Sequence, residues 1–342
     1  MGNEKPKIHN HIYSRFHIKK WLDNGGKIYD KTTKREREIN IDRDFAKRFY
    51  YSEDEPSNEL EDRISNFEAY IGRIIKKVDT AKRSVILTGK EYELLKLYCV
   101  LCANRHHFAI EVIKDDESEL YQSNDYQVGV FTINTKEDAL RMTRSIIEEF
   151  ERLKNQPEIK ATVYSPIGDD YPCSITRGLH LEILHRDNPD IIISNRYCLT
   201  ENTLDSDYLY TYVPVSPHTA LVIVKSQYYL DSQTFENTKI RFGKIYGDGS
   251  ADPYISEVFN GLEDLLFSSA YLAPSNVHVK ETYIKQEITP QVFLKIKDMP
   301  SIIVKQMNSM FCEDGTLILY CDKTALESAL KTKMPYREVM LF

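Results

Sequence analysis

The sequence predicts an α+β protein, with a helix-rich part over residues 1–157 and a strand-rich part over residues 158–342. Two observations favour this class. Several stretches of the first part repeat apolar residues at intervals of three and four, the period of an amphipathic helix. The second part holds more of the runs typical of strands. The regular strand–helix alternation and glycine-rich turns of a doubly wound fold are missing. We therefore predict one composite domain over residues 1–342, with the helical half packed on a mixed or antiparallel β-rich half.

The N-terminal segment predicts a series of short elements. Alternating side chains suggest an extended start, apolar residues at helical spacing follow it, and Asp23–Gly26 has the composition of a turn. In chain order we expect an extended segment at residues 9–13, a short helix ending at Trp21, a hairpin with strands at 27–31 and 37–41, and a short helix at 43–49.

Longer elements are expected in the rest of the chain, where helical and strand patterns cover more residues. In the first half we expect helices at 60–78, 90–104 and 134–153 and strands at 126–133 and 159–164. In the second half we expect a helix at 176–184, a buried strand from residue 190, strands at 208–213 and 219–224 around a Pro-Val-Ser-Pro corner, a helix at 256–273, and a strand at 317–320 followed by a covering helix up to residue 336.

Composition limits the classes of function. The formal charge of −7 does not suit a generic polyanion binder, although the Lys- and Arg-rich N-terminal segment leaves a local basic groove open. The 23 Tyr residues against one Trp suit recognition but are also ordinary in strands. We find no apolar signal segment, no run near the roughly 18 apolar residues of a membrane span, and no compact disulfide pattern. We expect a reduced, cytoplasmic protein without a membrane partner.

The stretch from His9 to Trp21 is the most distinctive, because it holds three of the nine His residues. If its start is extended, His9, His11 and Tyr13 project from one side and form a candidate catalytic group able to transfer protons. The nearby cations are candidate binding residues: Arg15, Lys19 and Lys20. The alternative is structural, with the aromatic residues anchored in the core and the His and Lys side chains satisfied or solvated.

Arg105, at the end of the helix expected at 90–104, is a further catalytic candidate. Its guanidinium can clamp a phosphate or carboxylate, or it can pair with Glu61 or Glu68 and lock two helices together. These two glutamates share one helical face. They are candidate metal or general-base carboxylates, or else a solvated pair beside the core stripe. Cys99 and Cys102 have metal-like spacing, but they lie in an apolar run without a second pair, so we expect core thiols rather than zinc.

The run His11-Ile-Tyr13-Ser-Arg-Phe16-His-Ile-Lys-Lys-Trp21 resembles the opening signature of the bacterial domain of unknown function family 4238. Members begin with His-x-Tyr, a Phe three residues later and a Lys/Arg-rich turn ending in Phe or Trp. Ser14-Arg15 departs from the Pro that is common there. Other segments resemble the family in the same order, so that the resemblance runs nearly end to end: Gly26–Lys31, Phe49–Tyr51, Leu60–Glu68, Arg105 and Pro214–Pro217.

In that family the strand matching residues 190–194 ends in a Ser-Asp-Asn-Pro type sequence, whose Asp is the natural catalytic or ligand candidate. This chain has Ser194-Asn195-Arg196-Tyr197 instead. Asn has no carboxylate charge, so it can neither act as a general base nor balance a hard cation. We keep Asn195 and Arg196 as binding candidates, predict no cofactor and no metal ligands, and leave a divalent metal open as an option.

The resemblance implies an uncharacterised bacterial protein associated with anti-phage defence, where effectors often cut nucleic acid. Our leading hypothesis is an intracellular, toxin-like nuclease of the RNase type. In it the N-terminal His and Tyr residues transfer protons, while Arg105 and a lysine face the phosphate. The alternative is a non-enzymatic sensor that binds a phage or host protein, which the acidic charge, the Tyr content and Asn195 favour. The candidate partners are therefore nucleic acid or a protein, and the oligomeric state stays open.

Overall fold

The computed structural model of the chain describes residues 9–11, 14–42, 44–48, 59–111, 126–128, 131–133, 136–163, 172–177, 179–195, 198–202, 208–225 and 287–332. In chain order the described elements are β1 His9–His11, α1 Arg15–Asp23, β2 Lys27–Asp30, β3 Arg35–Arg37, β4 Ala46–Arg48, α2 Glu59–Asp79, β5 Ser84–Thr88, α3 Gly89–Glu111, β6 Tyr126–Val128, β7 Phe131–Ile133, α4 Lys136–Asn155, β8 Ala161–Val163, β9 Leu179–His185, β10 Ile193–Ser194, β11 Leu199–Asn202, β12 Tyr208–Pro214, β13 Thr219–Lys225, β14 Glu287–Thr289, β15 Gln291–Asp298, α9 Ser301–Asp314, β16 Leu317–Tyr320 and α10 Lys323–Lys331.

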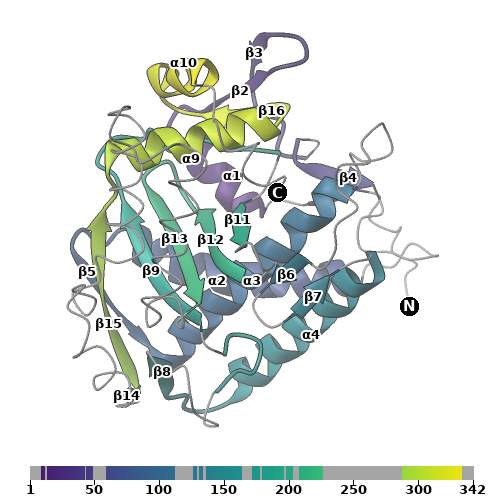
Figure 1. The fold of residues 1–342 in the computed structure, drawn as a ribbon. Coiled ribbons are helices and arrows are strands. Elements are labelled where there is room, and N and C mark those ends of the chain that lie inside the picture. Colours follow the sequence, from purple (N-terminus) through teal and green to yellow (C-terminus); the bar gives the residue numbers. More distant parts are fainter. Residues whose placement is uncertain are drawn as a thin grey trace, which may run out of the picture.

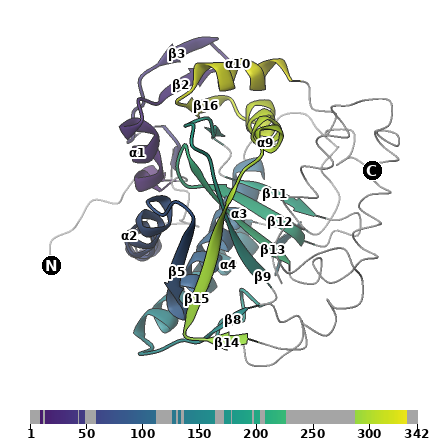
Figure 2. The same ribbon diagram turned by 90° about the vertical axis from the view of Figure 1, so that its left-hand side faces the viewer.

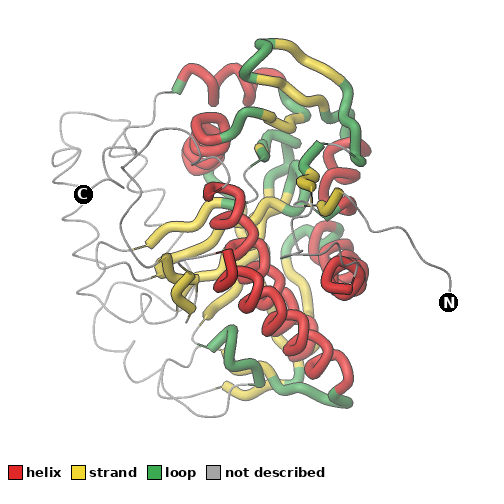
Figure 3. The backbone as a smooth tube through the Cα atoms, turned by 90° about the vertical axis from the view of Figure 1, so that its right-hand side faces the viewer, coloured by secondary structure: helices red, strands yellow, loops and turns green. Residues whose placement is uncertain are grey.

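The larger sheet has six strands within the described part of the chain, in the order β11-β12-β13-β9-β15-β5. Its neighbouring strands are antiparallel, except that β15 runs parallel to β9. The long helices of the N-terminal half lie on one side of these strands (Figures 1 and 3). The α+β class and the mixed sheet are therefore confirmed.

A smaller sheet joins strands that are far apart in the sequence. Its described strands follow the order β10-β16-β2-β3 and are antiparallel. Figure 2 shows this sheet with α10 at one end of the molecule, beyond the larger sheet. Both sheets thus combine strands from the two halves of the chain. A single composite domain would require this sharing, and the domain assignment itself stays a prediction.

Helices α2 and α4 have the one-sided apolar stripes that the sequence predicts. The apolar residues that repeat at intervals of three and four along these two helices are all buried: Leu60, Ile64, Phe67, Ile71, Ile74, Ile75, Val78, Ala139, Met142, Ile146, Phe150 and Leu153. Helix α3 differs, because its side chains are buried on all sides from Tyr92 to Arg105. It contacts α2, α4 and strands of the larger sheet, as expected of a helix that is apolar around its whole circumference.

The prediction of a helix at residues 176–184 was wrong. Residues 179–185 form β9, which lies between β13 and β15 in the larger sheet. From Leu179 to Ile183 apolar and polar residues alternate with the period of a strand, but both faces are buried, so the polar positions do not mark an exposed side. Its two buried polar residues, His180 and Glu182, are two positions apart and so share one face.

Three shorter predictions also needed correction. The helix expected at 43–49 is wrong, because residues 46–48 form β4 and pair with β1. Phe45 before it has a φ of 60°, which ends any helical path at that point. The hairpin of β2 is tighter than predicted, since its second strand begins at Arg35. Residues 126–128 and 131–133 form two paired strands, β6 and β7, rather than one.

Near the C-terminus the structure adds β15 and α9, which the sequence analysis did not predict. It agrees with the expected strands around the Pro-Val-Ser-Pro corner, which are β12 and β13, and with β16 and α10 at the end. The helix expected at 256–273 and the aromatic segment Phe49–Tyr51 lie outside the described residues.

Candidate functional site

The signature helix α1 is fixed in the core by Trp21. The indole of Trp21 is fully buried, and its Nε1–H donates to the carbonyl oxygen of Ile191 at 3.1 Å. The thiol of Cys321 in turn contacts the carbonyl oxygen of Trp21 at 3.5 Å. Helix α1 therefore bridges the segment just before β10 and the residue just after β16.

The start of α1 is held by a buried group of hydroxyl and imidazole side chains. The Tyr98 hydroxyl of α3 lies 2.8 Å from Ser14 Oγ and 3.4 Å from His17 Nε2. Burial, with the positive charges of Arg105 and Lys20, lowers the pKa of His17 to about 3. His17 is therefore a neutral imidazole at physiological pH. This group anchors the chain directly after the predicted catalytic residues.

The predicted catalytic residues themselves are only partly placed. His9 and His11 lie in β1, where the Cα register sets His9 opposite Arg48 and His11 opposite Ala46. The extended start of the signature is thus confirmed for residues 9–11, while the rest of that segment lies outside the described residues. Tyr13 and Arg196 lie outside the described residues.

Arg105 forms an ion pair with Glu68 that joins α3 to α2. Arg105 Nη1 lies 2.6 Å from Glu68 Oε1, and the arginine side chain is 1% exposed. Glu61, two turns earlier on α2, is also buried. The interpretation of Glu61 and Glu68 as a solvated pair was therefore wrong. The helix-locking alternative for Arg105 is observed, and contact of its guanidinium with a phosphate or carboxylate ligand stays a prediction.

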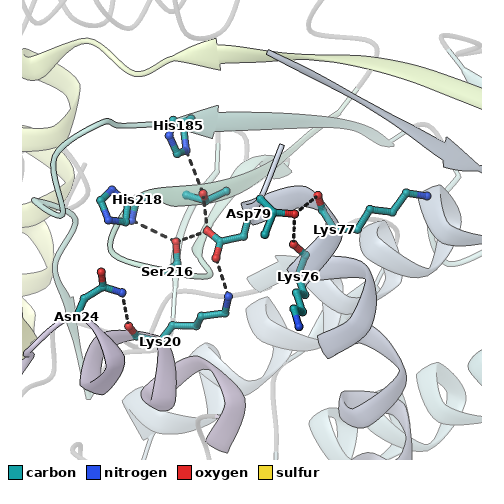
Figure 4. Close-up of polar contacts among 10 residues, drawn as sticks. Lys20, Asn24, Lys76, Lys77, Asp79, His185, Ser216 and His218 are labelled. Carbon is teal, nitrogen blue, oxygen red and sulfur yellow. Dashed lines mark hydrogen bonds and ion pairs between the residues drawn. The ribbon is translucent and has the colours of Figure 1, made fainter. Parts of the chain in front are cut away.

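Lys20 connects the signature helix to the end of α2 and to the Pro-Val-Ser-Pro corner (Figure 4). Its Nζ lies 2.7 Å from Asp79 Oδ2, while Asp79 Oδ1 accepts hydrogen bonds from Ser216 at 2.6 Å and Thr219 at 2.8 Å. Burial by itself would raise the pKa of Asp79, but the hydrogen bonds from Lys20 and Ser216 outweigh it and lower that pKa. Asp79 is thus an ionised junction between two segments that the family resemblance marks.

Two histidines complete this junction from the sheet side. His185 Nδ1 lies 3.2 Å from Thr219 Oγ1. The backbone N–H of His218 donates to Ser216 Oγ at 3.2 Å, and its Nδ1 lies 3.0 Å from the carbonyl oxygen of Arg186. These contacts hold the corner in place. Because Ser216 is buried and donates to a carboxylate whose pKa is lowered, the junction is poorly arranged for nucleophilic attack by Ser216.

The other predicted binding residues lie in different surroundings. Asn195 Oδ1 accepts backbone hydrogen bonds from Thr316 and Leu317, at 2.8 and 3.2 Å, and its amide donates to the Thr316 hydroxyl. Asn195 therefore fixes the turn before β16. Arg15 and Lys19 are exposed on α1, and Arg15 Nη2 lies 3.0 Å from Asp42 on the surface.

A second group of polar side chains, which the sequence analysis missed, is buried between α3 and β9. Its members are Tyr92, Glu93, Lys96, Thr176, His180, Glu182 and Lys297. The alternation of His180 and Glu182 within an apolar stretch could have indicated it, had that stretch been assigned as a strand.

No metal-binding arrangement is found in the part of the chain that the structure describes, where no group of three or more His, Cys, Asp or Glu side chains could hold an ion. Cys99 and Cys102 are buried in α3, and burial raises the pKa of the Cys99 thiol. Both thiols are packed in the core. A search of the described helices for a membrane-crossing segment found none of sufficient length and hydrophobicity.

The chain matches a known protein family. A family model described as protein of unknown function (DUF4238) matches residues 9–320 of the chain. No curated protein and no solved structure matches it. The matched region includes the signature helix, the segment around Asn195 and the Pro-Val-Ser-Pro corner, which the described contacts bring together around α1.

Proposed function

The chain belongs to the DUF4238 family of proteins of unknown function, and we propose that it is a nucleic-acid-cleaving, RNase-like effector that acts in the bacterial cytoplasm in defence against phage. Its reaction would use general acid–base chemistry at the segment that begins with His9, and would require no metal ion. The proposal rests on the way the core holds this segment.

The supporting observation is a preorganised scaffold that begins at Ser14, the residue that follows the candidate catalytic residues in the chain. Ser14, His17 and Tyr98 form a buried hydrogen-bonded group where α1 meets α3. The Arg105–Glu68 pair ties α3 to α2 nearby, since the charge of Arg105 acts on His17. Catalytic side chains need supports whose own positions are fixed by packing and hydrogen bonds. Burying charged and imidazole groups costs desolvation free energy, and clusters of such groups are common at functional sites.

In the proposed reaction a ribose 2′-oxygen attacks the adjacent phosphorus as one side chain removes its proton, and the 5′-oxygen leaves as another side chain protonates it. His11 and Tyr13 supply these two groups, with His9 two residues before His11 in β1. The phosphate faces Lys19 and Arg15, which are exposed. The Arg15–Asp42 pair is exposed on both sides, so a phosphate can displace Asp42 at little cost. Arg105 and Lys20 hold helices α3 and α1 in place through their ion pairs with Glu68 and Asp79.

Purified protein incubated with total RNA, single-stranded DNA and duplex DNA tests this proposal, in buffer with a divalent cation and in buffer with a chelator. RNA cleavage should persist in the chelator and should be lost in His11→Ala. His218→Ala is the matched control, because the contacts of His218 with Ser216, Arg186 and the His185 ring all lie at the Pro-Val-Ser-Pro corner rather than in the N-terminal segment, and it should cleave like the wild type. Both variants should retain the wild-type circular dichroism spectrum.

A second candidate function, a sensor that binds a phage or host protein, is favoured by one surface feature. Ile86 of β5 and Phe293 of β15 face each other across the strands, and their exposed fractions are 54% and 61%. Large apolar side chains side by side on a sheet surface are common in protein contacts. If no nucleic acid is cut under any condition, Phe293→Ser should weaken defence in a plaque assay, with Leu330→Ser, an exposed residue on α10, as the control.

A further inference from the structure

A second acid–base group lies in the first half of α3, well away from the signature. Tyr92 precedes Arg105 by 13 residues on the same helix, which corresponds to about 20 Å along the helix axis. Next to this part of α3, strand β15 changes its partner in the larger sheet. β15 pairs with β9 only over Ile296–Asp298 and with β5 over Gln291–Lys295. The first half of β9 therefore has no β15 partner, and side chains from α3 contact it there.

Three of these side chains form a proton relay. His180 Nε2 lies 3.3 Å from Glu182 Oε1, and His180 Nδ1 lies 3.3 Å from the Tyr92 hydroxyl. Burial would raise the pKa of Glu182, but its contacts with His180 and Lys297 outweigh this and lower it. An ionised Glu182 favours the tautomer with hydrogen on Nε2, which leaves the Nδ1 lone pair facing the Tyr92 hydroxyl. Carboxylate, imidazole and hydroxyl thus stand in the order used for proton transfer.

The neighbouring Lys96–Glu93 pair is almost fully enclosed and serves as the scaffold of this group, although Glu93 Oε1, which faces Lys96, makes no hydrogen bond of good geometry among the described residues. Both side chains are 1% exposed and their charged atoms are 2.9 Å apart. Glu93 also accepts a hydrogen bond from Thr176 at 2.8 Å, and Lys96 donates to the carbonyl oxygen of Leu179 at 3.3 Å. Their charges cancel, and their hydrogen-bonding groups are turned toward each other and toward the strand. This pair adds no free capacity for a ligand.

Lys297 is different, because its ammonium is buried and incompletely satisfied. Lys297 Nζ lies 2.5 Å from Glu182 Oε2, but it makes no hydrogen bond of good geometry within the part of the chain that the structure describes. An ammonium has three donors, and Glu182 faces one of them. The side chain is 21% exposed, so that solvent reaches the stem of Lys297 while the other members of the group are almost completely enclosed. Such N–H donors form charge-assisted hydrogen bonds with a small oxyanion.

We propose that Lys297, beside the Tyr92–His180–Glu182 relay, forms a binding site for a small oxyanionic ligand, either a phosphate or a carboxylate. Lys297 holds the anionic oxygen, and the relay lies within reach to exchange a proton with the bound molecule. This site does not depend on the cleavage proposed at the signature segment, and either can fail without the other.

Titration calorimetry with inorganic phosphate and, separately, with acetate tests the proposal at constant ionic strength. The wild type should bind at least one of the two saturably, and the comparison distinguishes phosphate from carboxylate. Lys297→Met should weaken binding at least tenfold. Lys295→Met is the matched control, because Lys295 is an exposed lysine two residues earlier on the same strand, and it should bind like the wild type. Absence of binding to both anions, or equal binding by Lys297→Met, would overturn the proposal.

A measurement on the unmodified protein covers the case in which Lys297→Met does not fold. In wild-type protein labelled with ¹⁵N at lysine Nζ, the buried ammonium of Lys297 should give a signal protected from exchange with water. Addition of the binding anion should shift that signal, and Lys297→Arg, which keeps a cation at the site, should bind within a few-fold of the wild type. An unshifted protected signal at saturating phosphate and acetate would refute the site.

Discussion

Lys20 of the signature helix and Asp79 at the end of α2 lie 2.7 Å apart, and the same carboxylate accepts hydrogen bonds from Ser216 and Thr219. One carboxylate therefore connects α1, α2 and the corner between β12 and β13. Two of these segments carry motifs of the family, although they are nearly 200 residues apart in the chain. Asp79 itself belongs to neither motif.

Asp79→Asn should destabilise the protein by about 2 kcal/mol at pH 7, the scale of hydrogen bonds to a charged group. Because the pKa of Asp79 is lowered in the folded state, its contribution is present at neutral pH and is lost as pH falls through that lowered value. Urea unfolding should thus give a smaller difference between wild type and variant below about pH 3.9, the ordinary pKa of Asp. Asp23→Asn, an exposed change on α1, should have little effect.

Replacing Arg105 should lower the free energy of unfolding much more than replacing a surface arginine. Arg105→Leu leaves Glu68 without its cation in a largely buried place, and such a break costs about 3–5 kcal/mol. The double variant Arg105→Leu/Glu68→Leu should recover much of that loss. Arg63→Leu is the matched control, since Arg63 pairs with Glu151 near the surface and should cost below about 1 kcal/mol. Equal losses for Arg105 and Arg63 would show that the α2–α3 pair does not stabilise the core.

His17 should make the protein sensitive to moderate acid. The pKa of His17 is about 3 in the folded protein and about 6.5 in the unfolded chain. Between these two pH values the unfolded chain therefore binds a proton at His17 and the folded protein does not. Its contribution to stability is therefore complete above pH 6.5 and falls by about 1.4 kcal/mol per pH unit below it. Denaturant unfolding from pH 7 to pH 5 should show a shallower slope for His17→Gln than for wild type. Identical slopes would contradict the neutral, buried state of His17.

Trp21→Ala should unfold the protein or reduce its stability by about 3–5 kcal/mol, because it removes a large buried ring and the hydrogen bond to Ile191. Thermal melting by circular dichroism measures this effect. Lys19→Ala, two residues earlier on the exposed side of α1, should melt with the wild type. A stable Trp21→Ala protein would show that the signature helix does not anchor the core.

The sequence was informative where one side of an element faces solvent. The stripes of α2 and α4 could be predicted because buried and exposed positions alternate with the helical period. β9 was mistaken for a helix although its first residues alternate, because its polar positions are buried rather than exposed, and with it the polar pair His180 and Glu182 was missed. β4 depends on its pairing with β1, a contact between distant residues that local patterns do not encode.

The candidate site shows the same difference between local and long-range information. The extended start, the signature helix and the choice of Glu68 as an Arg105 partner could be anticipated from spacing and charge. Asp79 could not, since its partners Lys20 and Ser216 are 59 and 137 residues away. Nothing in the sequence around Asp79 distinguishes it from an ordinary polar residue at a helix end.

The most direct test of the proposed function is the chemistry of the RNA ends produced in the presence of a chelator. Wild-type protein should yield 2′,3′-cyclic phosphate ends, because the 2′-oxygen is the attacking group and the cyclic ester is its immediate product, and His11→Ala should yield none. Absence of cleavage, cleavage that stops when divalent metal is removed, or undiminished cleavage by His11→Ala would each contradict a metal-independent reaction at the N-terminal signature.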